Sequence, residues 1–253
     1  MNRIQHLTQA LSSPATPLTS SVELARYSGG DDDAGHALFA PLHYETGYAY
    51  PLLVWLHGPR GDERQLKRIM PLVSMRNYVG VAPRGPVCEA AESSARGYSW
   101  RQSAEHIEQA EQRILSAIDA ARHRLHINAA RIFIAGFDCG GTMAFRMALN
   151  HPHQFAGALS LCGSFPTGLC PLRRLNELRS LPLFLAGGTH SECYPTEQVC
   201  DELRLFHAAG LSVTVRQYPC GDELTTLMLE DMNRWIMDQV CPAGAACESE
   251  TRA

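Results

Sequence analysis

The residue pattern with the clearest chemical meaning surrounds Asp138. An apolar segment, 131–137, leads into the turn Gly136-Phe-Asp-Cys-Gly140, and a segment with helical spacing, 141–150, follows at once. A strand, a glycine-flanked turn and a helix in immediate succession expose the central residue of the turn, so that it can act as a nucleophile. The central residue here is a carboxylic acid, whereas serine-type acyl transfer needs a neutral hydroxyl. We therefore expect altered chemistry at Asp138.

The elements that position this turn follow from the hydrophobic pattern. Compact apolar runs alternate with amphipathic segments along most of the chain, which is typical of a mostly parallel sheet covered by helices. The expected strands are 52–56, 78–82, 131–137, 156–161, 181–186 and 213–218. The expected helices are a long one behind Ser103 as N-cap, ending near Leu125, and three others at 141–150, 196–209 and 223–240.

The two ends of the chain differ from this central part. Short apolar alternations within 21–44, broken by the Gly- and Asp-rich stretch 28–33, predict a hairpin of edge strands beside the main sheet. We expect an N-terminal extension over 1–20, one domain over 21–240 and a flexible tail over 241–253.

Composition narrows the classes of protein and partner. The chain has 253 residues, 45% of them hydrophobic and 19% charged, which excludes a collagen, a coiled coil or a disordered chain as the overall description. A net charge of −4 argues against a nucleic-acid partner. No stretch approaches the roughly 18 apolar residues of a membrane span. The polar segment 1–17 lacks the apolar block of an export signal, so we expect a cytoplasmic protein.

The nine cysteines are interpreted as thiols, because no export signal precedes them. Their spacings never give C-x-x-C, so the usual structural zinc site is not expected, and no cofactor is indicated.

Four motifs in a fixed order carry a resemblance to a known family. They are the turn 136–140, the loop His57-Gly-Pro-Arg-Gly61 after an apolar run, Ala82-Pro-Arg-Gly-Pro86, and Gly97-Tyr-Ser-Trp100. Together they resemble the carboxylesterase, phospholipase and acyl-protein thioesterase branch of the α/β-hydrolase superfamily, over about 51–240. The resemblance implies an α/β-hydrolase fold, with a mostly parallel central sheet and helices on both faces. It also implies a Ser-His-Asp triad.

All three triad positions that the resemblance implies are substituted. Asp138 stands where the family has its serine, Ser191 stands at the acid position, and Asp222 stands at the base position. The conclusion that the histidine base is missing does not depend on how the sequences are aligned, because no histidine follows His207. The resemblance therefore predicts a protein without serine-hydrolase activity that acts as a binding or regulatory module, for a small-molecule or acyl ligand or for a protein partner.

The resemblance also locates an oxyanion hole. Its backbone N–H donors are expected at Cys139 and Arg60, because Pro59 has no N–H. An Asp138 carboxylate would compete with substrate for these donors. Asp138 and Asp222 would also raise the pKa of one member of the pair, and with Glu192 they could favour a cation.

An alternative keeps catalysis with different residues. Asp138 would attack as in haloalkane dehalogenases and epoxide hydrolases, His190 would serve as base, and Asp222 would orient it. A zinc site made of Cys139, Cys193, Cys220 and His190 is a further alternative with weaker support.

Structural interpretations are favoured for two other residues near the turn. Cys139 is expected to be a small packed residue that contributes its N–H, and His57 to brace its loop through hydrogen bonds. Trp100 either lines a binding pocket or packs beneath it.

Overall fold

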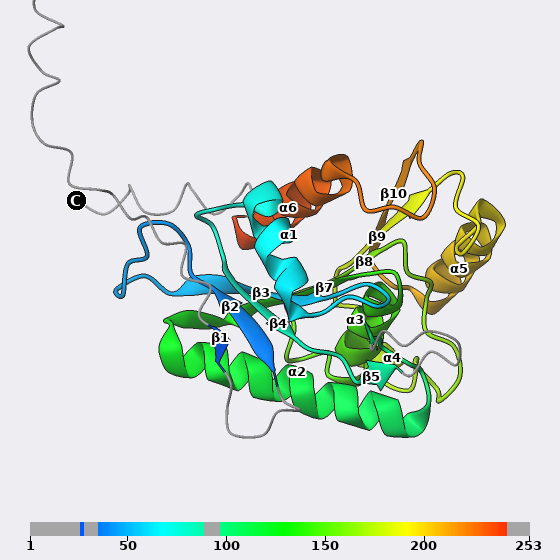
Figure 1. The fold of residues 1–253 in the computed structure, drawn as a ribbon. Helices are drawn as coiled ribbons and strands as arrows, with labels where there is room; N and C mark the ends of the chain where they lie inside the picture. The colour runs from blue at the N-terminus through cyan, green and yellow to red at the C-terminus, as the bar shows by residue number, and fades with distance from the viewer. Residues whose placement is uncertain (1–25, 28–34, 89–96, 242–253) are drawn as a thin grey trace, which may run out of the picture.

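The computed structural model describes residues 26–27, 35–88 and 97–241. A sheet of eight strands runs through them in the order β1-β2-β4-β3-β7-β8-β9-β10 (Figure 1). The strands are β1 (Arg26–Tyr27), β2 (His36–Phe39), β3 (Tyr50–Leu56), β4 (Val79–Pro83), β7 (Ile127–Phe137), β8 (Gly157–Leu161), β9 (Leu183–Gly188) and β10 (Val213–Tyr218). From β4 to β10 every neighbouring pair is parallel, which confirms the mostly parallel sheet.

All six strands expected from apolar runs are present within a few residues of their expected bounds. The largest difference is in β7, which begins at Ile127 because Tyr50 pairs with that residue before a register shift. The edge hairpin is also found. β1 pairs antiparallel with β2, and β2 pairs antiparallel with β4.

Helices cover both faces of the sheet. They are α1 (Leu66–Val73), α2 (Ala104–Arg124), α3 (Cys139–Asn150), α4 (Leu175–Leu178), α5 (Thr196–Ala209) and α6 (Thr226–Val240). The apolar residues of α1 and α6 pack on one face, and those of α2, α3 and α5 pack on the other. Figure 1 shows α1 and α6 above the sheet and α2 below it.

Helix termini differ from expectation in instructive ways. Ser103 precedes α2 as expected, but its hydroxyl contacts the His106 ring at 2.6 Å and does not cap the backbone. Helix α6 begins at Thr226, after the expected Glu223, because the Thr225 hydroxyl accepts the Met228 N–H at 3.3 Å.

Several short elements were not expected from the sequence. Helix α1 is one, and it is short and contains Pro71, which masks its periodicity. The others are the 3-10 turn η1 (Glu63–Gln65), helix α4 and the small hairpin of β5 (Val87–Cys88) with β6 (Gly97–Tyr98).

Some expectations fall on parts of the chain that the structure does not describe. The extension 1–20, the acidic stretch 28–33 and the tail after Cys241 lie outside the described residues. Within the described ranges, no helix has the length and apolar character to cross a bilayer.

Parallel strands bring the candidate residues to one edge of the sheet. The loops that follow β3, β7, β9 and β10 carry His57, Asp138, Ser191 and Asp222, respectively. Because the carboxyl ends of parallel strands lie along the same edge, these loops gather at the position where α/β proteins bind ligands.

Candidate functional site

Asp138 occupies a sharp turn between β7 and α3. Its backbone has φ 51° and ψ −120°, a conformation that residues with a side chain rarely adopt. The Asp138 N–H donates to the Leu161 carbonyl at 2.8 Å, and its carbonyl accepts the Thr142 N–H at 3.0 Å. A Cβ at Gly136 would collide with the Gly140 backbone, and one at Gly140 would collide with the Leu56 backbone. The two glycines therefore allow the tight strand-to-helix packing that the turn requires.

The Asp138 carboxyl is shifted toward its neutral form. Burial is the largest cause of its raised pKa, and the negative charge of Asp222 adds to it. A hydrogen bond from the Cys139 backbone N–H acts in the opposite direction.

The other expected donor, Arg60, lies in the loop after β3 and also has a positive φ, of 57°. A Cβ at Gly97 would lie 3.1 Å from the Arg60 Cα, so β6 packs closely against this loop. The Arg60 side chain is exposed.

The residues at the acid and base positions contact one another. The Ser191 hydroxyl donates to the Asp222 carboxylate. Two backbone N–H groups donate to the same carboxylate, Glu192 at 3.2 Å and Cys193 at 3.3 Å. The Tyr194 N–H donates in turn to the Ser191 hydroxyl oxygen at 2.8 Å. Asp222 therefore holds the loop between β9 and α5 in place through these hydrogen bonds.

The pKa values of the Asp138 and Asp222 carboxyls are shifted in opposite directions. The bond from Ser191 is the main reason that the Asp222 pKa lies below its usual range, whereas the Asp138 pKa lies above it. The sequence predicted a raised pKa for one member of the pair, and the structure assigns it to Asp138. Asp222 keeps its negative charge more readily than an ordinary aspartate.

His190 lies in the same loop, between β9 and α5. Its backbone N–H donates to the Cys220 carbonyl at 2.9 Å, and its side chain is exposed. Among the described residues, the His190 ring makes no hydrogen bond or ion pair, and the Asp222 carboxylate is bonded to Ser191 instead.

The zinc alternative is not supported by the geometry. Within the described part of the chain, which contains Cys139, Cys193, Cys220 and His190, no group of three or more His, Cys, Asp or Glu residues is placed to hold a metal ion. The interpretation of Cys139 as a packed residue agrees with the structure, since burial raises its pKa and the Ser99 hydroxyl contacts its sulfur at 3.6 Å.

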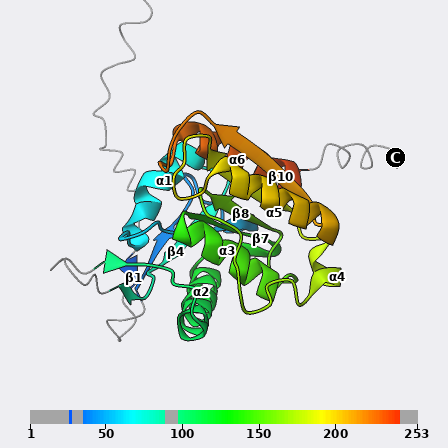
Figure 2. The same cartoon turned by 90° about the vertical axis from the view of Figure 1, so that its right-hand side faces the viewer.

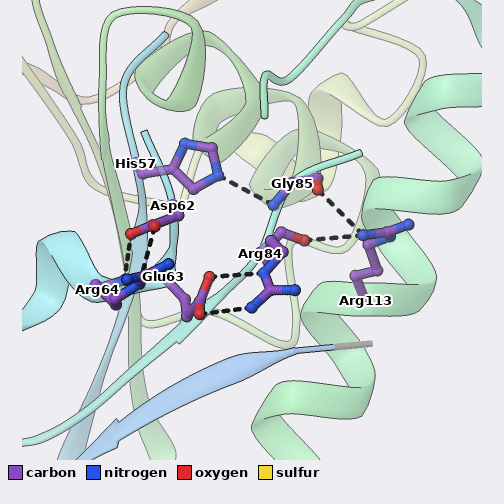
Figure 3. A network of polar contacts seen from close by, with 7 residues as sticks. All are labelled: His57, Asp62, Glu63, Arg64, Arg84, Gly85 and Arg113. Carbon is purple, nitrogen blue, oxygen red and sulfur yellow. Dashed lines mark hydrogen bonds and ion pairs between the residues drawn. The ribbon is translucent and has the colours of Figure 1, made fainter. Parts of the chain in front are cut away.

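His57 braces the loop after β3 (Figure 3). Its fully buried ring contacts the Gly58 carbonyl through Nδ1 at 2.8 Å and accepts the Gly85 N–H at Nε2, at 3.0 Å. Burial lowers the His57 pKa, which favours the neutral ring that this arrangement needs. Trp100 is 1% exposed and donates its Nε1–H to the His57 carbonyl at 3.1 Å, so it packs beneath the loop.

A polar network supports this brace, and no sequence motif pointed to it (Figure 3). Both Glu63 carboxylate oxygens accept hydrogen bonds of 2.8 Å from Arg84, with 1% and 15% of the two side chains exposed. Burial alone would raise the Glu63 pKa, but the bonds from Arg84 hold it below its usual range. Arg113 on α2 donates to the carbonyls of Arg84 and Gly85 at 3.2 and 3.1 Å. Three separate segments are thereby tied together next to the site.

Comparisons with known proteins agree with this architecture. The model of the Phospholipase/Carboxylesterase family matches residues 47–239. A putative esterase, NocK from Nocardia uniformis subsp. tsuyamanensis, is 27% identical over 140 residues, which is 53% of this chain. The match spans 39% of that relative's length.

Solved structures share the fold at lower identity. The carboxylesterase from Mesorhizobium loti has a TM-score of 0.67 and 18% identity, with 84% of this chain and 98% of that one covered. The Bacillus cereus carboxylesterase has a TM-score of 0.64 and 20% identity, over 81% and 93% of the two chains. Arabidopsis thaliana SOBER1 has a TM-score of 0.63 and 18% identity, over 76% and 100%. With its sheet order, its turn at Asp138 and a family match over most of its length, this chain belongs to the phospholipase/carboxylesterase family and has the α/β-hydrolase fold.

Proposed function

We propose that this family member has lost serine-hydrolase chemistry and acts as a binding or regulatory protein, with a small-molecule or acyl ligand or a protein as its partner. The observation that carries the proposal is the hydrogen bond from Ser191 to Asp222. In a triad, the residue at the base position receives the proton of the nucleophile. Here that position holds a carboxylate that keeps the Ser191 loop closed.

Neither carboxyl has the properties that acyl transfer needs. Asp222 has a lowered pKa, so it is a weaker base than an ordinary aspartate and far weaker than an imidazole. Asp138 has no hydroxyl to activate, and a negative charge on its carboxyl would repel an oxyanion that forms beside the Cys139 N–H. The proposed loss of chemistry thus involves nucleophile and base together.

The alternative of an Asp138 nucleophile with His190 as base has less support. It needs the His190 ring at a water beside an ester on Asp138, with Asp222 orienting the ring. The ring is exposed, and the Asp222 carboxylate already accepts three donors from residues 191–193. Catalysis by this route would require the β9–α5 loop to open.

Activity-based labelling tests the main proposal. The full chain is incubated with a fluorophosphonate probe and assayed with p-nitrophenyl esters and a thioester, beside an active serine hydrolase as positive control. We expect no labelling and no turnover above the level of Asp138→Ala. Esterase activity that Asp138→Ala abolishes would contradict the proposal.

Mass spectrometry separates the alternative from the main proposal. Protein trapped with an alkyl halide, which releases its halide on attack, or with an epoxide, whose ring opens on attack, is digested and searched for an adduct on the Asp138 peptide. An ester on Asp138 that accumulates in His190→Ala would establish the carboxylate nucleophile and its base. We expect no adduct on Asp138 in the unchanged protein or in His190→Ala.

A further inference from the structure

Strand β10 ends the sheet on the side away from the β1–β2 hairpin. Within residues 26–27, 35–88 and 97–241 it pairs only with β9, in parallel, from Val213 to Tyr218. Figure 2 looks toward this edge, where β10 lies beside α5 and α6. An unpaired edge of this length, without proline, is a template for a further strand.

The hydrogen bonds to β9 establish which backbone groups of β10 face outward. The carbonyls of Ser212 and Tyr218 accept the N–H groups of Leu183 and Thr189, at 2.9 and 2.8 Å. Backbone groups alternate in direction along a strand, so the even-numbered residues of β10 face β9. The odd-numbered residues Val213, Val215 and Gln217 therefore turn their N–H and carbonyl groups to the free edge.

A second copy of the same strand satisfies all of these groups in one register. If a two-fold axis passes beside Val215, Val215 of one copy lies opposite Val215 of the other. Val213 of each copy then lies opposite Gln217 of the other copy. An axis at Arg216 would instead place two guanidinium groups opposite each other and bring Pro219, which has no N–H, into the ladder. An axis at Thr214 would leave Gln217 without a partner in β10.

The side chains fit the same register. Val213 and Val215 are half-buried on the α5 face, so the axis would bring two valines into direct contact there. On the α6 face, Arg216 would lie opposite Thr214 of the second copy.

The surface next to Thr214 and Arg216 carries both signs of charge. A hollow between β10 and α6 is lined by Phe184, Thr214, Arg216, Asp231, Arg234, Trp235 and Asp238. Asp231 already accepts hydrogen bonds from Tyr218 and Arg234, at 2.8 and 2.7 Å. Asp238 is exposed and has no hydrogen bond or ion pair to the described residues, so it can receive Arg216 of the second copy. Mixed charge of this kind is self-complementary, as a two-fold interface requires.

From this geometry we propose that β10 is a homodimer interface, in which two copies pair antiparallel about Val215 and form one continuous sheet. The dimer adds a strand to an open edge, as in β-augmentation, and uses a surface separate from the site around Asp138.

Sedimentation velocity of the full chain over a range of concentrations tests the proposal. We expect a reversible dimer. Val215→Pro removes an N–H that faces away from β9, so the sheet of each copy is spared while the dimer is lost. Val215→Thr keeps the N–H and the branched side chain and serves as the matched control, with dimerisation unchanged. Far-UV circular dichroism checks that both variants fold.

Charge variants give a test that does not depend on proline. Arg216→Glu should weaken the dimer about tenfold, and adding Asp238→Arg should restore it, because the pair is then reversed. Arg122→Glu, the same charge change on α2, should have no effect. A chain that stays monomeric at every concentration, or Val215→Pro that dimerises like the parent, overturns the proposal. Concentration-independent protection of the Val215 amide from hydrogen exchange also overturns it, since another part of the chain would then cover the edge.

Discussion

The two sides of the candidate site are held together in different ways. On the side of β3 and β4, His57, Glu63 and Arg84 form a buried network that holds the loop after β3. On the side of β9 and β10, the Ser191 hydroxyl donates to the Asp222 carboxylate and joins two loops. We call the first side the scaffold side, because its network fixes the loop after β3. The comparison teaches that one side of the site is fixed by a buried ion pair, whereas the other depends on a hydrogen bond between two loops.

The largest effect is expected from breaking the scaffold side. Glu63→Ala leaves the Arg84 guanidinium, only 15% exposed, without its carboxylate. An unpaired buried charge costs about 3–5 kcal/mol, and we expect a loss of this size in the free energy of unfolding measured with urea. Arg64→Ala, which removes an ion pair whose arginine is 61% exposed, is the control and should change it by less than about 1 kcal/mol. Equal effects of the two variants would mean that the network does not hold the loop.

Reverting the other side tests whether the scaffold still works. The triple variant Asp138→Ser, Ser191→Asp and Asp222→His places a hydroxyl, a carboxylate and an imidazole at the three positions of the proposed triad. We expect esterase activity about 10²-fold above that of the unchanged chain, because proton transfer by a positioned side chain increases the rate by at least about this factor. The variant with only Asp138→Ser is the control and should stay inactive. A folded triple variant without activity would show that the scaffold side has changed as well.

A smaller effect is expected from breaking the hydrogen bond between Ser191 and Asp222. Ser191→Ala removes the O–H donor of Asp222 and the acceptor of the Tyr194 N–H, and should cost about 1–2 kcal/mol near pH 7. Because the Asp222 pKa is lowered in the folded state, its contribution is present above the usual aspartate range and is lost as pH falls through the lowered value. The difference between the two proteins should therefore shrink in acid. Ser180→Ala, at an exposed hydroxyl, should differ little at any pH.

The smallest effect concerns the carboxyl of the turn itself. The Asp138 pKa is raised, so its folded state holds a proton more readily and loses stability as pH rises through the aspartate range. Asp138→Asn keeps the shape and tolerates positive φ, and it should stabilise the protein by about 0.5 kcal/mol at pH 7 after solvent screening. Thermal unfolding at pH 4 and pH 7 measures this, and a gain that is the same at both values would contradict the assignment.

Much of the fold could be predicted because apolar runs and helical periodicity are local. The runs around 52–56 and 213–218 and the helix 196–209 are found where the pattern placed them. Helix α1 was missed because Pro71 interrupts a segment with few residues. The predicted start of α6, at Glu223, is three residues too early, because Thr225 caps the helix. The sequence alone does not distinguish Glu223 from Thr226 as the first helical residue.

The sequence offered candidate residues for the site but not their contacts. The resemblance to a family pointed to Asp138, Ser191 and Asp222 as candidates, yet the bond between the last two depends on how two loops fold back over the sheet. The Glu63–Arg84 pair joins residues on different strand ends, and Arg113 reaches it from a helix later in the chain. Long-range pairs of this kind leave no periodic trace, which is why charge patterning did not reveal them.

The backbone of the turn has a positive φ at Asp138. Gly136 and Gly140 allow the start of α3 to pack against the ends of β7 and β3, so the bend is needed simply to join that strand to its helix. The shape of the backbone at this point therefore follows from the architecture and not from the side chain at its apex. A search that selects proteins by the outline of this turn would group this chain with those that carry a hydroxyl there, whatever the chemistry of each.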